Sequence, residues 1–139
     1  MIRILYVEDD ASDADLARHV LTRNAGYSVE IVTTLALAYT RLKTSMTFDL
    51  LLCDLRLPDG SGLDLLTWVR EQSLPLAVVI VTGSGDQDMA VAALKAGAND
   101  YVVKREDYLK TLPTTLPVFS RVKSIAVSPG LADSRLALV

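Results

Sequence analysis

The chain has 139 residues, of which 50% are hydrophobic and 22% are charged, and its formal net charge is −3. This length suits one domain, and the balance of apolar and charged residues excludes a disordered chain. The negative charge, with no cluster of Lys and Arg, argues against direct binding to nucleic acid.

Targeting and redox signals point to the cytoplasm. The single cysteine cannot form an internal disulfide, which fits a reducing compartment. The opening sequence "MIRILYVEDD" turns acidic too early for the apolar core of a signal peptide. No apolar stretch approaches the roughly 20 residues that span a bilayer. We therefore expect a soluble, single-domain, cytoplasmic protein with no membrane partner.

Short β-type runs alternate with helical patterns along the whole chain. In chain order, the patterns predict a strand at 2–7, a helix at 12–26 that stops at Gly26, a strand at 28–33, a helix at 35–44, a strand at 49–54, a helix capped by Ser61 that runs to about Gln72, a strand at 76–82, a helix at 86–97 that is also closed by a glycine, and a strand at 100–104.

Five such repeats with apolar strands predict an α/β fold, a parallel sheet with helices on both faces and right-handed crossovers. The run "LAVVIVT" (76–82) is the most apolar, so we expect it to be the central strand. Periodicity alone does not fix the strand order. Pro113 and Pro117 cannot both lie inside one regular helix, so a last helix is expected to begin at one of them. Residues 128–139 look like a linker or disordered tail.

Polar side chains follow four of the five predicted strands. They are Glu8, Asp9 and Asp10 after the first strand, Asp54 at the end of the third, Thr82 at the end of the fourth and Lys104 at the end of the fifth. In an open parallel sheet, ligands bind at the carboxyl ends of the strands, so these residues predict one shared site.

The residue types indicate the chemistry of that site. Clustered carboxylates repel one another unless a cation lies between them, and their hard oxygen ligands suit Mg²⁺ or Mn²⁺. A lysine and a hydroxyl group suit a phosphoryl group, whose oxygens must be neutralised and held. Asp54 follows the apolar run "LLLC", where a buried carboxylate needs a partner. It is poised as a metal ligand or as a nucleophile towards phosphorus.

Each residue alone also has an ordinary structural explanation. The acidic triplet could simply favour the start of a helix, Lys104 could be solvated, and Asp54 could belong to the Pro-Asp-Gly turn that follows it. Their occurrence together at matched strand ends favours the functional interpretation.

Four motifs resemble those of the receiver domain of two-component response regulators. They are "ILYVEDD", "DLLLCDLRLPDGSGLDLL", "VVIVTGSG" and "GANDYVVK", in the family's order and spacing, within roughly residues 2–110. The resemblance implies a flavodoxin-like, doubly wound, five-stranded parallel sheet of order 2-1-3-4-5. It assigns residues 1–127 to the receiver domain and leaves 128–139 as the tail.

The resemblance also implies a metal site. Asp54 matches the phosphoacceptor aspartate, and Glu8 and Asp9 match the acidic pair that binds Mg²⁺, with Mn²⁺ as an alternative. Asp9 matches the direct ligand and Glu8 the ligand that acts through water. Arg56 matches the position whose backbone carbonyl completes the metal shell.

Three further positions match the phosphate-binding and switch residues of the family. Thr82 and Lys104 match the phosphate-binding hydroxyl and lysine, and Tyr101 matches the switch aromatic. The family usually has proline after this lysine, often with a cis bond, whereas Arg105 follows here. A cis bond before another residue costs about 2.5–4 kcal/mol, so we expect a trans bond, with Lys104 still directed at Asp54.

By this resemblance, the chain takes phosphate from a histidine kinase or a histidine phosphotransfer protein onto Asp54. It would then switch the binding of a protein partner at the surface of the fourth helix, fifth strand and last helix. It would turn over no substrate beyond its own slow dephosphorylation. A Mg²⁺-dependent phosphatase or a nuclease of the Toprim kind is the alternative, but those classes typically have a second aspartate where Arg56 stands. A scaffold receiver that is never phosphorylated is the third hypothesis, and the complete residue set counts against it.

Overall fold

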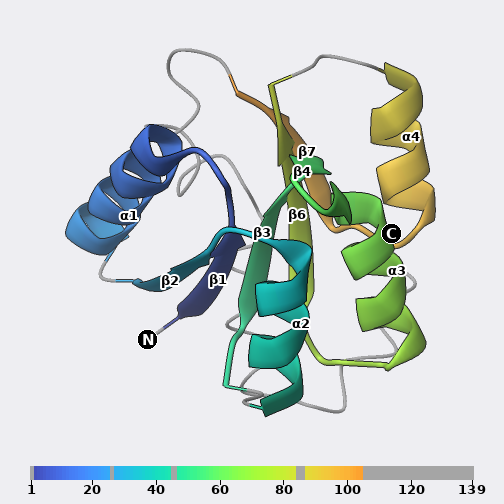
Figure 1. Cartoon of the computed structure of the whole chain (residues 1–139), viewed down its shortest axis with the longest axis horizontal. Coiled ribbons are helices and arrows are strands. Elements are labelled where there is room, and N and C mark those ends of the chain that lie inside the picture. The colour runs from blue at the N-terminus through green and yellow to red at the C-terminus, as the bar shows by residue number, and fades with distance from the viewer. Residues whose placement is uncertain (1, 26, 45–46, 84–86, 105–139) are drawn as a thin grey trace.

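The computed structural model describes residues 2–25, 27–44, 47–83 and 87–104. Its main sheet is parallel, and its strand order, β2-β1-β3-β6-β7, is the predicted 2-1-3-4-5 (Figure 1). The strands are β1 (Arg3–Val7), β2 (Ser28–Val32), β3 (Leu50–Asp54), β6 (Ala77–Thr82) and β7 (Asp100–Val103). The helices are α1 (Ala11–Ala25), α2 (Leu35–Thr44), α3 (Gly62–Glu71) and α4 (Gln87–Lys95).

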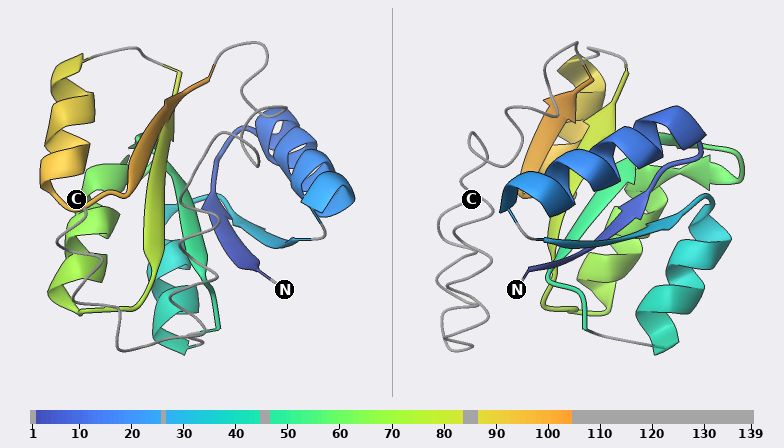
Figure 2. Two further views of the ribbon diagram at one scale, coloured as in Figure 1. Left: turned by 180° about the vertical axis from the view of Figure 1, so that it is seen from behind. Right: turned by 90° about the vertical axis from the view of Figure 1, so that its left-hand side faces the viewer.

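Alternate residues of each strand face opposite sides of the sheet, and both sides are covered. On one side, residues such as Leu5, Leu51 and Val78 pack against α2, α3 and α4. On the other side, residues such as Ile4 and Leu52 pack with the buried face of α1. The two helical layers are visible from the front and from the side (Figures 1 and 2). The doubly wound arrangement predicted from the sequence is confirmed.

The middle of the sheet is β3, and not the strand that we expected from its apolar sequence. β6 lies beside it, between β3 and β7. Both strands are buried along their entire length. Apolar content therefore identifies the interior strands of this sheet but does not rank them.

Capping residues in the sequence correctly predicted the start of α3 and the end of α4. The Ser61 hydroxyl accepts a hydrogen bond from the Leu63 backbone N–H (3.1 Å) and caps α3, as predicted. Gly97 follows α4 with φ of +110°, a conformation that glycine adopts readily. The predicted stop at Gly26, the Lys104–Arg105 bond, the last helix at Pro113 or Pro117 and the tail at 128–139 lie outside the described residues.

The sequence did not predict the small hairpin that follows Asp54. It consists of β4 (Arg56–Leu57) and β5 (Gly60–Ser61), which pair antiparallel. Strands this short have no hydrophobic period that a sequence pattern could reveal. None of the helices among the described residues is long and apolar enough to cross a membrane.

Candidate functional site

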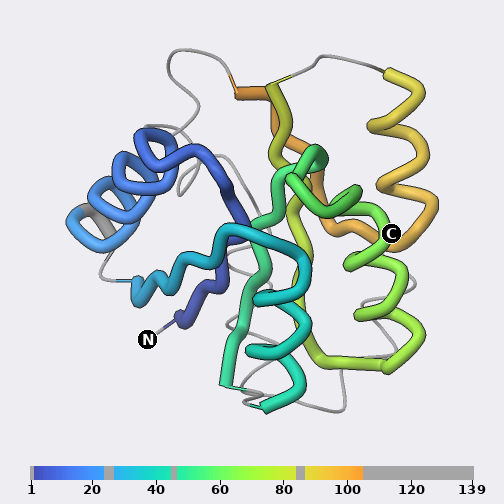
Figure 3. Tube along the Cα trace, in the orientation of Figure 1, coloured from blue at the N-terminus to red at the C-terminus, as the bar shows by residue number. Residues whose placement is uncertain are grey.

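The carboxyl ends of the parallel strands meet at one edge of the sheet, which is the upper edge in Figure 3. Asp54 ends β3 beside Val81 of β6, and Glu8 follows directly on β1. The Lys104 backbone N–H donates to the Thr82 carbonyl (2.7 Å), which fixes the end of β7 next to the end of β6. The strand register therefore brings the predicted residues together.

Three polar side chains at this edge are buried. The exposed fractions are 1% for Glu8, 8% for Asp54 and 1% for Thr82. Removing two carboxylates from water is costly unless an opposite charge and hydrogen bonds compensate them. Glu8 therefore needs a compensating partner as much as Asp54 does.

Lys104 is that partner. Its ammonium group donates to Glu8 Oε1, to Asp54 Oδ2 (3.0 Å) and to Asp13 Oδ2 (3.1 Å). An ammonium group has three N–H donors, so this set can use all of them. Burial alone would lower the pKa of Lys104, but the bonds to Glu8, Asp54 and Asp13 outweigh it and raise the pKa above its usual value. Lys104 therefore stays charged at neutral pH.

Glu8 lies in a mixed environment. Burial raises its pKa, the hydrogen bond from Lys104 lowers it, and the neighbouring Asp54 raises it again, so that the net direction is upward. The Tyr6 hydroxyl donates to Oε1 (3.3 Å), and the Asp10 backbone N–H donates to Oε2 (3.3 Å). These contacts hold the carboxylate in place, facing Asp54.

Glu8, Asp9 and Asp54 form a cluster that could hold a metal ion. Each offers an oxygen, and these oxygens all lie within 4.8 Å of one another. Glu8 and Asp54 are buried while Asp9 is exposed, so one side of the cluster is open to water. Carboxylate oxygens with room for water suit Mg²⁺, which keeps several waters when it binds. The residues present therefore fit this ion.

Arg56 contributes through its backbone. Its N–H donates to Asp54 Oδ1 (3.2 Å), so that both carboxylate oxygens of Asp54 accept a hydrogen bond. Its side chain is exposed. The predicted role of its carbonyl as a metal ligand stays a prediction.

Thr82 and Tyr101 occupy different surroundings. Thr82 is fully buried at the end of β6. Tyr101 is partly buried and packs against the core cluster beneath α2, α3 and α4. Their roles in binding phosphate and in switching stay predictions.

Sequence reasoning missed Asp13. It lies in the first turn of α1, and its backbone N–H donates to Asp10 Oδ1 (2.9 Å), which caps the helix. In the sequence, Asp13 resembles any acidic residue in the first turn of a helix, and nothing sets it apart as the acidic triplet 8–10 is set apart. Its contact with Lys104 depends on how α1 packs on the sheet, which no local pattern shows.

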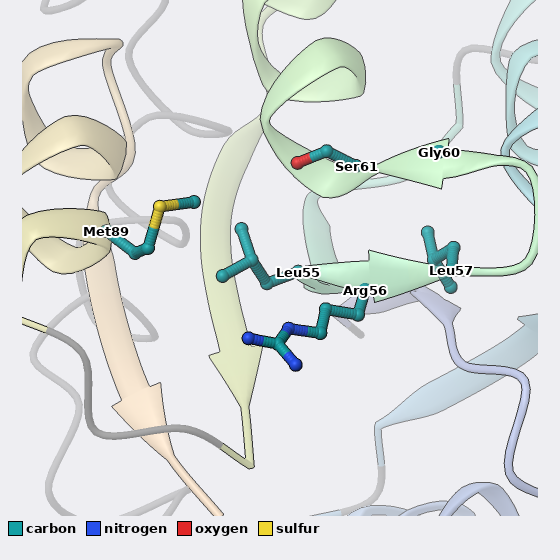
Figure 4. Close-up of a pocket in the computed structure, with 6 residues that line it drawn as sticks. All are labelled: Leu55, Arg56, Leu57, Gly60, Ser61 and Met89. Atoms are coloured by element: carbon teal, nitrogen blue, oxygen red, sulfur yellow. The ribbon is translucent and has the colours of Figure 1, made fainter.

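A pocket of about 320 Å³ lies beside the site, between the hairpin and α4 (Figure 4). Leu55 and Arg56, which directly follow Asp54, extend into it, as does Met89 from α4. Leu57, Gly60 and Ser61 complete its lining. The pocket adjoins the candidate site on the side of α4.

The strand order is that of a receiver domain, as the motifs predicted. Residues 4–113 match the response regulator receiver domain family, and the chain belongs to it. It is a receiver domain of two-component response regulators.

Similar proteins agree with this assignment. The chain is 43% identical over 102 residues to the alginate biosynthesis transcriptional regulatory protein AlgB of Pseudomonas putida, which covers 73% of the chain and 22% of AlgB. Its fold matches the receiver domain of a putative LuxO repressor protein from Vibrio parahaemolyticus, with a TM-score of 0.81, 31% identity and coverage of 91% and 95% of the two chains. It also matches the beryllofluoride-activated NtrC4 receiver domain dimer, with a TM-score of 0.77, 30% identity and coverage of 88% and 99%. The chain spans about a fifth of the length of the first curated relatives.

Proposed function

We propose that Asp54 accepts a phosphoryl group from a histidine kinase or a histidine phosphotransfer protein. The observation that supports this most directly is the buried Glu8–Asp54 pair with the Lys104 ammonium between them, at the open edge of the sheet. Glu8, Asp9, Asp54 and the Arg56 carbonyl would hold Mg²⁺, or Mn²⁺ in its place. The bound ion would neutralise charge on the phosphoryl oxygens.

The residues of the chain have defined parts in this transfer. A carboxylate oxygen of Asp54 attacks the phosphorus of the donor's phosphohistidine, the P–N bond breaks as the O–P bond forms, and the imidazole leaves with the electron pair. Lys104 then donates to a phosphoryl oxygen, and the Thr82 hydroxyl donates to another. Attack of water on the aspartyl phosphate would release inorganic phosphate and regenerate the Asp54 carboxylate, which makes the protein at most a slow phosphatase of itself.

The phosphorylated state would be transmitted through Thr82 and Tyr101 to the surface of α4, β7 and the last helix. The partner at this surface would be a protein, because this chain is acidic and has no basic cluster. AlgB is named a transcriptional regulatory protein, and the chain matches about a fifth of it. We infer that the receiver controls transcription through its partner or through the rest of such a protein, where DNA contacts would lie.

Intact-mass spectrometry with Mg²⁺ and acetyl phosphate tests the proposal. The expected result is one added phosphoryl group, which is absent in Asp54→Asn and in excess EDTA. The same gain in Asp54→Asn would refute Asp54 as the acceptor. With a labelled acyl phosphate, release of phosphate without a labelled protein would favour the phosphatase, and no reaction at all would favour the scaffold.

A further inference from the structure

We infer that Asp13 is a positioning residue for Lys104: when a divalent ion takes the oxygens of Glu8 and Asp54, the Asp13 carboxylate keeps the ammonium group on the α1 side of the site. The inference rests on the proposed function, because it concerns the metal and the lysine that this function uses. Asp13 lies outside the set of positions that the resemblance assigned.

The three acceptors of Lys104 are not equivalent. Glu8 and Asp54 belong to the cluster whose oxygens lie within 4.8 Å of one another, whereas Asp13 does not. A cation in that cluster competes with Lys104 for the oxygens of Glu8 and Asp54. The bond to Asp13 (3.1 Å) is therefore the contact that Lys104 can keep when the ion binds.

The backbone of Asp13 is fixed by the start of α1. Its N–H donates to Asp10 Oδ1 (2.9 Å), the next N–H, of Ala14, donates to the Asp10 carbonyl (3.0 Å), and the Ala14 side chain is buried. The Asp13 side chain is 41% exposed, and that of Lys104 is 14% exposed. An ion pair that is open to water on one side contributes little to stability, but it can still direct a flexible lysine.

Asp13 can favour Mg²⁺ binding through two electrostatic effects, which experiment can separate. Asp13 carries a negative charge near the site, which attracts Mg²⁺ through space whether or not Lys104 is present. If Asp13 also draws Lys104 away from Glu8 and Asp54, its removal must weaken Mg²⁺ binding more when the lysine is there. A double-mutant cycle measures this difference.

The test is titration calorimetry of Mg²⁺ with the unphosphorylated chain. Asp13→Asn is expected to weaken Mg²⁺ binding by about two- to fivefold in the wild-type background, and by clearly less in the Lys104→Met background. Asp13→Glu should restore most of the affinity. Asp15→Asn is the control, because Asp15 is exposed on the same helix two residues further on. Thermal unfolding of each variant shows whether any change comes from lost structure.

A second readout follows Lys104 directly. In NMR spectra, the side-chain signals of Lys104 should shift in Asp13→Asn and stay in place in Asp15→Asn. An equal loss of Mg²⁺ affinity in both backgrounds, or an unmoved Lys104 signal, would overturn the inference. A wild-type chain that binds Mg²⁺ but takes no phosphoryl group would overturn the proposed phosphoacceptor function alone, and one that binds no Mg²⁺ would overturn both.

Discussion

At the scale of single residues, the position of Asp54 depends on Gly62, which has no side chain to press against it. Gly62 begins α3, and its N–H donates to the Leu55 carbonyl (2.8 Å). A Cβ atom there would lie 2.4 Å from the Asp54 carbonyl oxygen and 2.9 Å from Cys53 Sγ. Both neighbours are buried in the central strand, so neither can move without shifting Asp54.

We therefore predict that Gly62→Ala destabilises the fold by about 1–3 kcal/mol, the usual range for overpacking a tight core, and slows phosphorylation of Asp54. Gly83→Ala is the matched control, since a Cβ atom at Gly83 meets nothing within 4 Å. Chemical denaturation should show a clear loss for the first variant and little for the second. Equal stability of the two variants would contradict the packing argument.

Much of the site could be predicted, because the local sequence around several of its residues indicates their role. Asp54 ends an apolar run, and a carboxylate there had to be compensated. Lys104 comes from the end of another strand, and the topology of the sheet brings the two together. Asp13 could not be predicted in the same way, because its contact depends on the packing of α1 over the sheet.

At the scale of elements, hydrogen bonds join the hairpin that follows Asp54 to the start of α2. The Asp59 carboxylate, in the turn of the hairpin, accepts from the backbone N–H groups of Leu35 (2.9 Å) and Ala36 (3.0 Å). These bonds cap α2 from a distant part of the chain and lower the pKa of Asp59. A Pro-Asp-Gly sequence predicts a turn, but it does not predict which helix the aspartate caps.

An ion pair between β2 and α2 contributes to stability in a way that depends on pH. Glu30 on β2 forms an ion pair with Arg41 on α2, and Arg41 Nη2 lies 2.9 Å from Glu30 Oε1. The hydrogen bond from Arg41 lowers the pKa of Glu30 below its usual value of 4.5. A lowered pKa in the folded state means that the stabilisation is present above about pH 4.5 and is lost as the pH falls through the folded value.

We predict that Glu30→Gln lowers stability slightly at pH 7, and that the difference from the wild type disappears as the pH falls below 4.5. The effect is small because the two side chains are 37% and 34% exposed and water screens the pair. Urea denaturation of both proteins between pH 3 and 7 measures it. A difference that grows towards low pH would show that Glu30 is not stabilised as a carboxylate.

At the scale of the whole molecule, the alternating periods in the sequence predicted the two helical layers, whereas the strand order was predicted only through the resemblance to receiver domains. The hydrogen bonds that join α3 to the segments before β6 and β7 could not be predicted in this way. Arg70 on α3 donates to the Gly97 carbonyl (2.9 Å), the Leu76 carbonyl (2.7 Å) and Asn99 Oδ1 (2.8 Å). In the sequence this arginine resembles any basic residue in a last helical turn. Its three partners come from the segments before β6 and β7, whose approach only the complete fold determines.

We predict that a phosphoryl group on Asp54 changes the surface of the molecule at α4 and β7. Such a group adds about −1.5 to −2 of charge and seeks hydrogen-bond donors. Thr82 is buried at the end of β6, the strand next to that of Asp54, and Tyr101 lies one strand further on in β7, partly buried. Drawing Thr82 towards the phosphate leaves space that the Tyr101 ring can fill, which alters the face formed by α4 and β7.

Hydrogen–deuterium exchange with and without acetyl phosphate, both in Mg²⁺, measures this change. Amides in α4 and β7 should change protection, whereas those of β2, at the opposite edge of the sheet, should not. Couplings of about 1–3 kcal/mol are typical, so the change should be graded rather than complete. Thr82→Ala should remove most of the effect while Asp54 is still phosphorylated, and Tyr101→Ala should reduce it. If phosphorylated Thr82→Ala responds as the wild type does, the signal leaves the site by another face.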